Sequence, residues 1–205
     1  MSIPHGETLI DLQVEAPQEV NSDLPVVTLS RRGQADFEML SIGALSPLSG
    51  FMGADDYQSV LNKMRLKNGL IWSLPIVLPV EDELAEHLKS FGEAVLKGNG
   101  GEVLGKITIE DIYRADKEKE AETVFLTSDG AHPGVASLQK LGNWYVAGEV
   151  EAYKFPHHGK FSQYRHSPAE LRQLFQEKEW KTVVAFQTRN PIHRAHEYLT
   201  KCALE

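Results

Sequence analysis

Short apolar runs separated by turn residues dominate the first three quarters of the chain. Runs of this length, bounded by Gly, Pro, Asn and Ser, are typical of β-strands. The runs that we interpret in this way are Pro25–Leu29, Leu74–Val80, Glu93–Leu96, Glu102–Ile109 and Trp144–Val150. The Gly-rich stretch 97–101 predicts a hairpin between two of them. The two prolines in 74–80 place that run at a sheet edge or in an irregular element.

Three other segments carry apolar residues at helical spacing. We expect helices over Gln34–Leu45, Asp55–Met64 and Glu81–Lys89. The charged run Asp116–Glu120 alternates in sign, which favours a solvated face of a further helix. This region therefore combines a sheet with several short helices.

The pattern changes near 155–160, where we place a boundary. The stretch 167–170, Ser-Pro-Ala-Glu, is a typical helix start, with a capping serine and a proline at the first helical position. We expect this helix to extend to Glu177. The continuous apolar run Thr182–Phe186 then predicts a strand that is buried on both faces, as in a parallel sheet.

Composition narrows the class of protein. The 205 residues contain 21 Lys and Arg against 29 Asp and Glu, a net charge of −8, which argues against a general binder of nucleic acid or anionic membranes. Cys202 is the only cysteine, so no disulfide framework or CxxC zinc site is expected. No run approaches the length of a membrane span, and the N-terminus lacks a secretory signal. We expect a cytoplasmic protein.

The segment that carries chemistry is 187–197, which directly follows the buried strand. Asn190 is a suitable helix cap and Pro191 suits the first helical position, so a new helix is expected to begin there. Its polar residues would then lie where a strand ends and a helix begins. That position offers free backbone N–H groups and favours anions.

The side chains of this segment suit the same purpose. Arg189 carries a rigid fork of donors for a tetrahedral oxyanion, and Gln187 and Thr188 add neutral donors. His193 and His196 are three residues apart and so share one helix face. Each residue alone has an alternative interpretation as a surface or packing residue, and a histidine pair without a third ligand does not predict a metal site. Their convergence predicts an oxyanion or nucleotide site.

Here the sequence also resembles a known family. The string VVAFQTRNPIHRAHE at 183–197 is similar to the signature of ATP sulfurylases, that is, sulfate adenylyltransferases. Residues 45–52, 115–122 and 132–135 resemble the same family, in the same order. Residues 193–196, His-Arg-Ala-His, occupy the place of its phosphate-binding HxGH-type motif, with Ala195 where many relatives in the wider group have Gly.

The resemblance implies a fold class and a domain division. It implies a mainly β, PUA-like N-terminal domain over residues 1–165. The first strand-helix unit of a Rossmann-like nucleotidylyltransferase domain, truncated, would follow over 166–205, giving an α+β to α/β protein. Apart from the resemblance, we expect His132, His157 and His158, in this domain or at its edge, to be structural or surface residues.

The resemblance also implies a reaction, in which sulfate attacks the α-phosphorus of ATP to give adenosine 5′-phosphosulfate and pyrophosphate. Mg²⁺ would enter with the nucleotide as MgATP, with no protein-bound metal. Gln187 and Arg189 would bind sulfate. The residues implied to bind ATP are Gln187, Thr188, Arg189, Asn190, His193 and His196. The residues implied to be catalytic are Thr188, Arg189, Asn190, His193 and His196, and the intact enzyme would be a homo-oligomer.

One buried parallel strand with one and a half helices does not make a sheet with two covered faces. We therefore expect this chain to be a fragment of a larger enzyme, inactive alone, whose first 165 residues fold independently. Two alternatives stay open. One is a nucleotidylyltransferase with another acceptor, and the other is a non-catalytic β-domain module that binds RNA or a protein partner. The net charge and the lack of a basic stripe speak against RNA.

Overall fold

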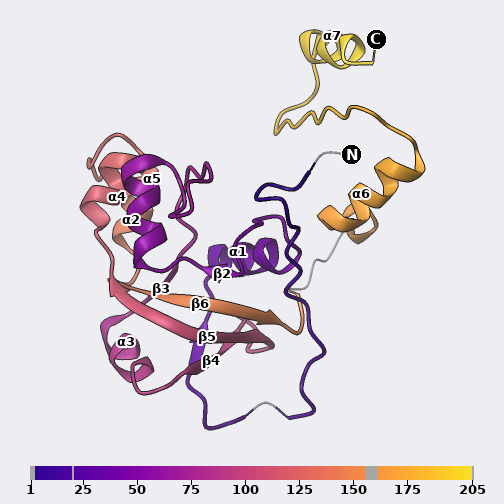
Figure 1. The fold of residues 1–205 in the computed structure, drawn as a ribbon. Helices are drawn as coiled ribbons and strands as arrows, with labels where there is room; N and C mark the ends of the chain where they lie inside the picture. Colours follow the sequence, from indigo (N-terminus) through magenta and orange to yellow (C-terminus); the bar gives the residue numbers. More distant parts are fainter. Residues whose placement is uncertain (1–2, 20, 156–160, 205) are drawn as a thin grey trace. The chain divides into compact units, whose positions relative to one another are not determined.

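A computed structural model describes residues 3–19, 21–155 and 161–204 (Figure 1). The chain divides into two compact units, a larger one that extends to Ala169 and a smaller one that begins at Glu170. The predicted boundary at 155–160 falls largely outside the described residues, as do His157 and His158.

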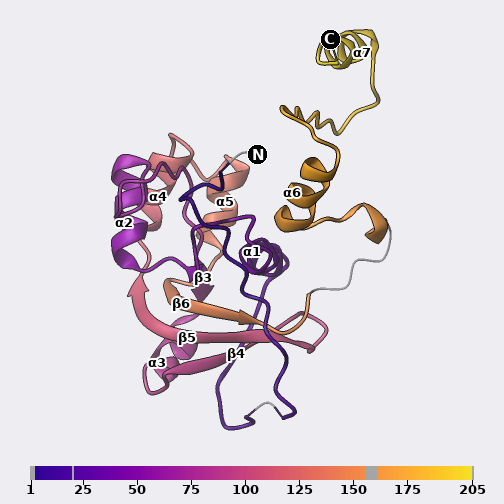
Figure 2. The same cartoon turned by 45° about the vertical axis from the view of Figure 1, so that its right-hand side comes forward.

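The larger unit is organised by a mixed sheet with the order β1-β4-β5-β6-β2, in which β3 also pairs with β6. Its strands are β1 (Val26–Thr28), β2 (Gly50–Phe51), β3 (Leu78–Val80), β4 (Glu93–Lys97), β5 (Val103–Arg114) and β6 (Trp144–Ala152). The β1–β4 pair is parallel and the others are antiparallel. The two longest strands, β5 and β6, are neighbours and form the centre of the sheet (Figure 2).

A bulge interrupts the β5–β6 ladder. The register shifts between Ile109 and Asp111, so that Glu110 has no partner on β6. Gly148 lies opposite, with a φ of +147°, and a Cβ on it would come within 1.8 Å of the Thr108 carbonyl oxygen. Only glycine fits such a close approach of two backbones. The bulge therefore depends on Gly148.

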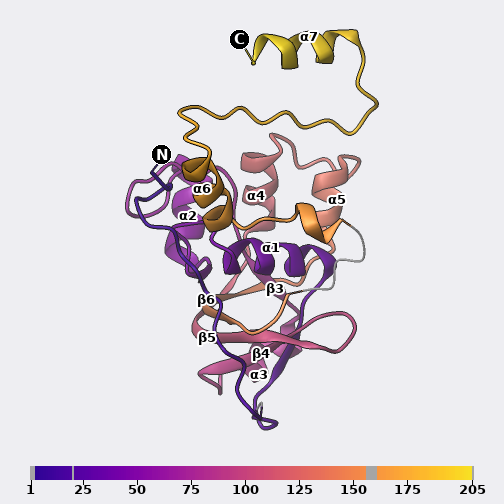
Figure 3. The ribbon, with the colours of Figure 1, turned by 90° about the vertical axis from the view of Figure 1, so that its right-hand side faces the viewer.

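Helices cover both faces of this sheet, with α1 on one side and α3 on the other (Figures 1 and 3). The helices of the larger unit are α1 (Arg31–Ser41), α2 (Ala54–Lys63), α3 (Asp82–Leu88), α4 (Lys117–Val124) and α5 (Pro133–Gln139). The last two and α2 gather at the end of the sheet where β5 stops. Side chains from α1, α3 and the sheet form one main core, which includes Val27, Phe37, Leu40, Leu88, Leu96, Leu104 and Ile107.

Most predicted elements of this unit are confirmed, with shifted ends. The run 74–80 forms a strand only from Leu78, because Pro75 has no N–H and the residues before Leu78 remain irregular. The first helix begins three residues earlier than predicted, since Ser30 Oγ accepts a hydrogen bond from Gly33 N–H at 3.1 Å and caps it. Helix α5 was not predicted. His132 caps it, its Nδ1 accepting from Gly134 N–H at 3.2 Å, which is a structural role.

The interpretation of 116–120 as a solvated helix face is wrong for one residue. The run does open helix α4, but Glu120 is only 8% exposed. The hydroxyls of Tyr57 and Tyr145 each donate to its Oε2 at 2.9 Å. Burial raises the pKa of the Glu120 carboxyl, against the opposing effect of these two hydrogen bonds. The sequence pattern did not reveal this because the tyrosines come from distant segments, α2 and β6.

The smaller unit contains less regular structure. Helix α6 (Pro168–Glu177) begins at the predicted proline, in a position that the sequence identified correctly. Residues 182–188 have no regular structure, and Val184 and Phe186 are 69% and 43% exposed. The predicted buried strand over 182–186 is therefore wrong for this chain. A strand forms only when its backbone groups have a neighbouring strand to bond, and the described residues supply none there.

The last helix also starts later than predicted. Helix α7 (Arg194–Cys202) follows His193 as its N-cap residue, so neither Asn190 nor Pro191 is at its start. The extended stretch before it is visible in Figure 3. Asn190 is instead bonded locally to Thr188, which keeps the chain out of a helical conformation at this point.

The buried carboxyl of Glu120 predicts a pH effect on stability. Because its pKa is raised in the folded chain, the folded state holds the proton more tightly than the unfolded state, and stability falls as pH rises from about 4.3 through the folded pKa. Glu120→Gln keeps an acceptor for the two tyrosines and removes this titration. Urea unfolding between pH 4 and 7 should therefore show a smaller loss of stability in the variant than in the wild type.

The control for this measurement is Glu118→Gln, on the same helix and exposed. It should leave the pH dependence of unfolding unchanged. Equal pH dependence in the wild type and in Glu120→Gln would show that the buried carboxyl does not resist ionisation.

Candidate functional site

The six predicted site residues all lie in the extended stretch before α7 or in its first turn. Gln187, Arg189, Asn190 and His193 are exposed, whereas Thr188 and His196 are half-buried. The structure brings these residues together in two small groups. Neither Gln187 nor Arg189 forms a hydrogen bond or ion pair with either group among the described residues, so both side chains are open to a ligand.

The first group is a turn made by Thr188 and Asn190. Thr188 Oγ1 accepts a hydrogen bond from Asn190 N–H at 3.1 Å and donates one to the Asn190 carbonyl oxygen at 3.1 Å. A hydroxyl bonded in this way holds the backbone in a turn. Arg189 lies between these two residues, at the tip of the turn, and its side chain is exposed.

The second group is the histidine pair. The rings of His193 and His196 are stacked, with centroids 3.7 Å apart and planes 28° apart. Glu197 N–H donates to the His193 carbonyl oxygen at 3.1 Å, which begins the helix. The two imidazoles lie together, but the prediction that they share one helix face is wrong, because His193 is the extended N-cap residue that precedes α7. Their role toward a ligand stays a prediction.

Phe186 is a contact of this group that sequence reasoning missed. Its ring centroid lies 5.3 Å from that of His196. The sequence pattern predicts this residue in the buried strand, where it would face a core instead. Its position immediately before Gln187 was the only signal in the sequence for a role at the site.

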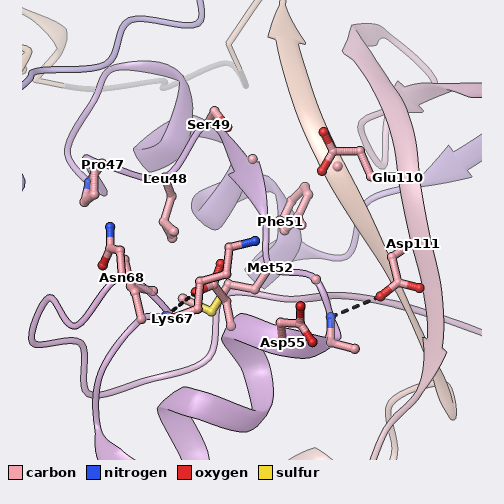
Figure 4. A pocket seen from close by; sticks show the side chains of 16 residues that line it. Pro47, Leu48, Ser49, Phe51, Met52, Asp55, Lys67, Asn68, Glu110 and Asp111 are labelled. Carbon is pink, nitrogen blue, oxygen red and sulfur yellow. Dashed lines mark hydrogen bonds between the residues drawn. The ribbon is translucent and has the colours of Figure 1, made fainter.

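A larger cavity lies elsewhere, in the larger unit (Figure 4). It has a volume of about 560 Å³ and is lined by residues 47–56, by 66–68, by Glu110 and Asp111 on β5, and by Gly148. Four carboxylates and one lysine are among these residues. Such a lining repels anions, so this cavity is unsuited to sulfate or to a nucleotide phosphate.

One carboxylate of this cavity has a structural role. Asp111 Oδ2 accepts a hydrogen bond from Ala54 N–H at 3.1 Å, at the start of α2 (Figure 4). The N-cap residue of that helix, Gly53, has no side chain to do so. The bulge at Glu110 turns Asp111 to this position.

No helix among the described residues has both the length and the apolar character needed to cross a membrane. Within the same residues, no three His, Cys, Asp or Glu side chains are grouped as ligands of one metal ion.

Two family models match the chain. The PUA-like domain family matches residues 2–155, and the ATP-sulfurylase family matches residues 162–205. All six predicted site residues lie in the second match. The resemblance to ATP sulfurylases that the motifs indicated is thereby confirmed, as is the order of a PUA-like domain followed by the start of a Rossmann-like one.

Curated relatives point the same way. The chain is 48% identical to a sulfate adenylyltransferase of Synechococcus sp. and 49% identical to one of Chloroflexus aurantiacus, over 98% of its own length. It is 45% identical to a probable bifunctional SAT/APS kinase of Sorangium cellulosum. The chain spans about half the length of the first two, 53% and 52%, and 36% of the third.

One solved structure is also similar. It is the hexameric APS kinase from Thiobacillus denitrificans, with a TM-score of 0.75 and 30% identity, and the match covers 98% of this chain and 37% of that one.

The capping contact at the cavity yields a stability prediction. Asp111→Ala removes the acceptor for Ala54 N–H and should lower the free energy of unfolding by about 1 kcal/mol, the usual cost of a lost helix cap. Glu110→Ala is the matched control, because the Glu110 side chain lies next to Asp111 on the bulge and is exposed. Chemical denaturation measures both. Equal effects of the two substitutions would contradict the capping role.

Proposed function

The chain belongs to the PUA-like domain family, and we propose that it forms part of a sulfate adenylyltransferase, which transfers AMP from ATP to sulfate. The observation that carries the proposal is the ATP-sulfurylase match over 162–205, which contains the oxyanion segment 187–196. The relatives supply the activity by name, and the chemistry of the segment fits it.

The proposed reaction joins two anions. A sulfate oxygen attacks the α-phosphorus of ATP, a new S–O–P linkage forms, and the bond from the α-phosphorus to the bridging oxygen breaks. Pyrophosphate leaves with that electron pair. Sulfate carries no proton that must be removed at neutral pH, so no general base is required, and the main task of the protein is to offset charge and align the reactants.

Each site residue has a proposed part in that task. Gln187 and Arg189 bind sulfate, with Arg189 held at the tip of the Thr188–Asn190 turn. Thr188 and Asn190 line the ATP phosphates together with Gln187 and Arg189, and the Asn190 side-chain amide supplies a donor. His193 and His196 stabilise the charge that develops on the phosphates in the transition state.

We treat Mg²⁺ as part of the substrate, MgATP. The segment offers amide and hydroxyl oxygens, but Glu197, the carboxylate that follows His196 in the sequence, is paired with Lys201 at 2.6 Å. Mg²⁺ is usually held through substrate phosphates and one or two carboxylates. In this proposal the segment therefore binds the phosphates, and Mg²⁺ stays coordinated by the nucleotide.

We propose that the two domains divide at residue 165. The activity is proposed to need further residues of the catalytic domain, which the longer relatives contain. A homo-oligomer is proposed as well, since the similar APS kinase is described as hexameric. A cytoplasmic location fits the single thiol, Cys202.

The direct test is a chimera. The chain is joined to the portion of the Chloroflexus aurantiacus relative that it does not match, and pyrophosphate release from MgATP is measured with and without sulfate. Release that depends on sulfate is expected. Arg189→Ala should lower kcat/KM about 100-fold or more, because an aligned charged donor is lost where negative charge accumulates.

Lys181→Ala is the control, an exposed cation in the same stretch, and it should leave kcat/KM unchanged. Release that requires an acceptor other than sulfate would favour a different nucleotidylyltransferase. A chimera that folds but releases no pyrophosphate, while the chain binds RNA in a salt-dependent gel shift, would favour the non-catalytic module.

A further inference from the structure

Phe186 contacts the candidate site without carrying any group that binds an anion. Its ring is 5.3 Å from the ring of His196 and inclined to it by 56°. It comes from the extended stretch, whereas His196 lies in the first turn of α7. The contact therefore joins the two segments that hold the proposed ligands of sulfate and ATP.

His196 lacks the contact that usually orients a functional histidine. In most such residues one ring nitrogen bonds to a carbonyl or carboxylate and fixes the ring while the other nitrogen acts. Here His196 Nδ1 is buried and has no hydrogen-bond partner among the described residues. The orientation of this ring is left to its neighbours, which are the stacked His193 ring and the Phe186 ring.

We propose that Phe186 is a positioning residue, which sets the orientation of the His196 ring and, through the 3.7 Å stack, of His193. The inference rests on the proposed function, in which both imidazoles face the phosphates. Aromatic rings prefer tilted contacts at this separation, so an aromatic side chain at 186 selects one ring orientation. An aliphatic side chain of similar size fills the space without that preference.

The physical consequence lies in the turnover step. Anion donors contribute most when they are aligned before the charge develops, and a displacement of about 1 Å costs up to a hundredfold in rate. Loss of the aromatic ring should thus affect kcat more than the KM for ATP, because ground-state binding also uses Gln187, Thr188 and Arg189.

The experiment compares Phe186→Leu with Phe186→Tyr. In the 205-residue chain, NMR of labelled imidazoles reports the ring-current shift of His196, whose signals are identified by their absence in His196→Gln. The Leu variant should lose the ring-current contribution of residue 186 and the Tyr variant should retain it. Val184→Leu is the control, since Val184 is 69% exposed and lies two residues away.

In the chimera, Phe186→Leu should lower kcat about tenfold with little change in KM. Phe186→Tyr should keep kcat close to that of the unsubstituted chimera. Unchanged His196 signals in the Leu variant, or equal losses of kcat in the Leu and Tyr variants, overturn the inference. The NMR comparison needs no substrate. An inactive unsubstituted chimera would therefore count against the proposed function, and the NMR result alone would then decide whether Phe186 positions the rings.

Discussion

The backbone of a strand must find hydrogen-bond partners, and this constraint accounts for both units of the chain. In the larger unit the pairing of β5 with β6 satisfies this constraint. The other edge of β5 pairs with β4, and β2 and β3 pair with β6. The bulge at Glu110 lies within the β5–β6 ladder, and helices pack on both faces of the sheet that it organises. In the smaller unit the run 182–186 has no partner among the described residues, and it remains extended and exposed.

Local signals in the sequence predicted most of the elements and few of the contacts between them. The hairpin at 97–101 and the helix start at Pro168 follow from a few neighbouring residues, so they were predictable. The burial of Glu120 was not, because it depends on tyrosines that only the fold brings to it. The candidate site was predicted from motif and position, but helix α7 begins only at Arg194, after a side-chain turn between Thr188 and Asn190.

The charge of the surrounding side chains distinguishes two regions, each of which could be taken for a binding site. The large cavity of the larger unit is rimmed by carboxylates, one of which, Asp111, is committed to capping α2. The segment 187–196 is small and open, but it collects an arginine, amides, a hydroxyl and two imidazoles. Size alone would favour the cavity, whereas the chemistry of a doubly charged oxyanion favours the segment. The aromatic contact from Phe186 gives that segment internal order without a surrounding sheet.

The most direct measurement is a crystal structure of the chimera with pyrophosphate bound. The account predicts that the Arg189 guanidinium and both imidazoles lie about 2.7–3.1 Å from phosphate oxygens, in one shared cleft. Pyrophosphate bound in the carboxylate-lined cavity, or Arg189 and the two histidines directed away from any common ligand, would contradict it.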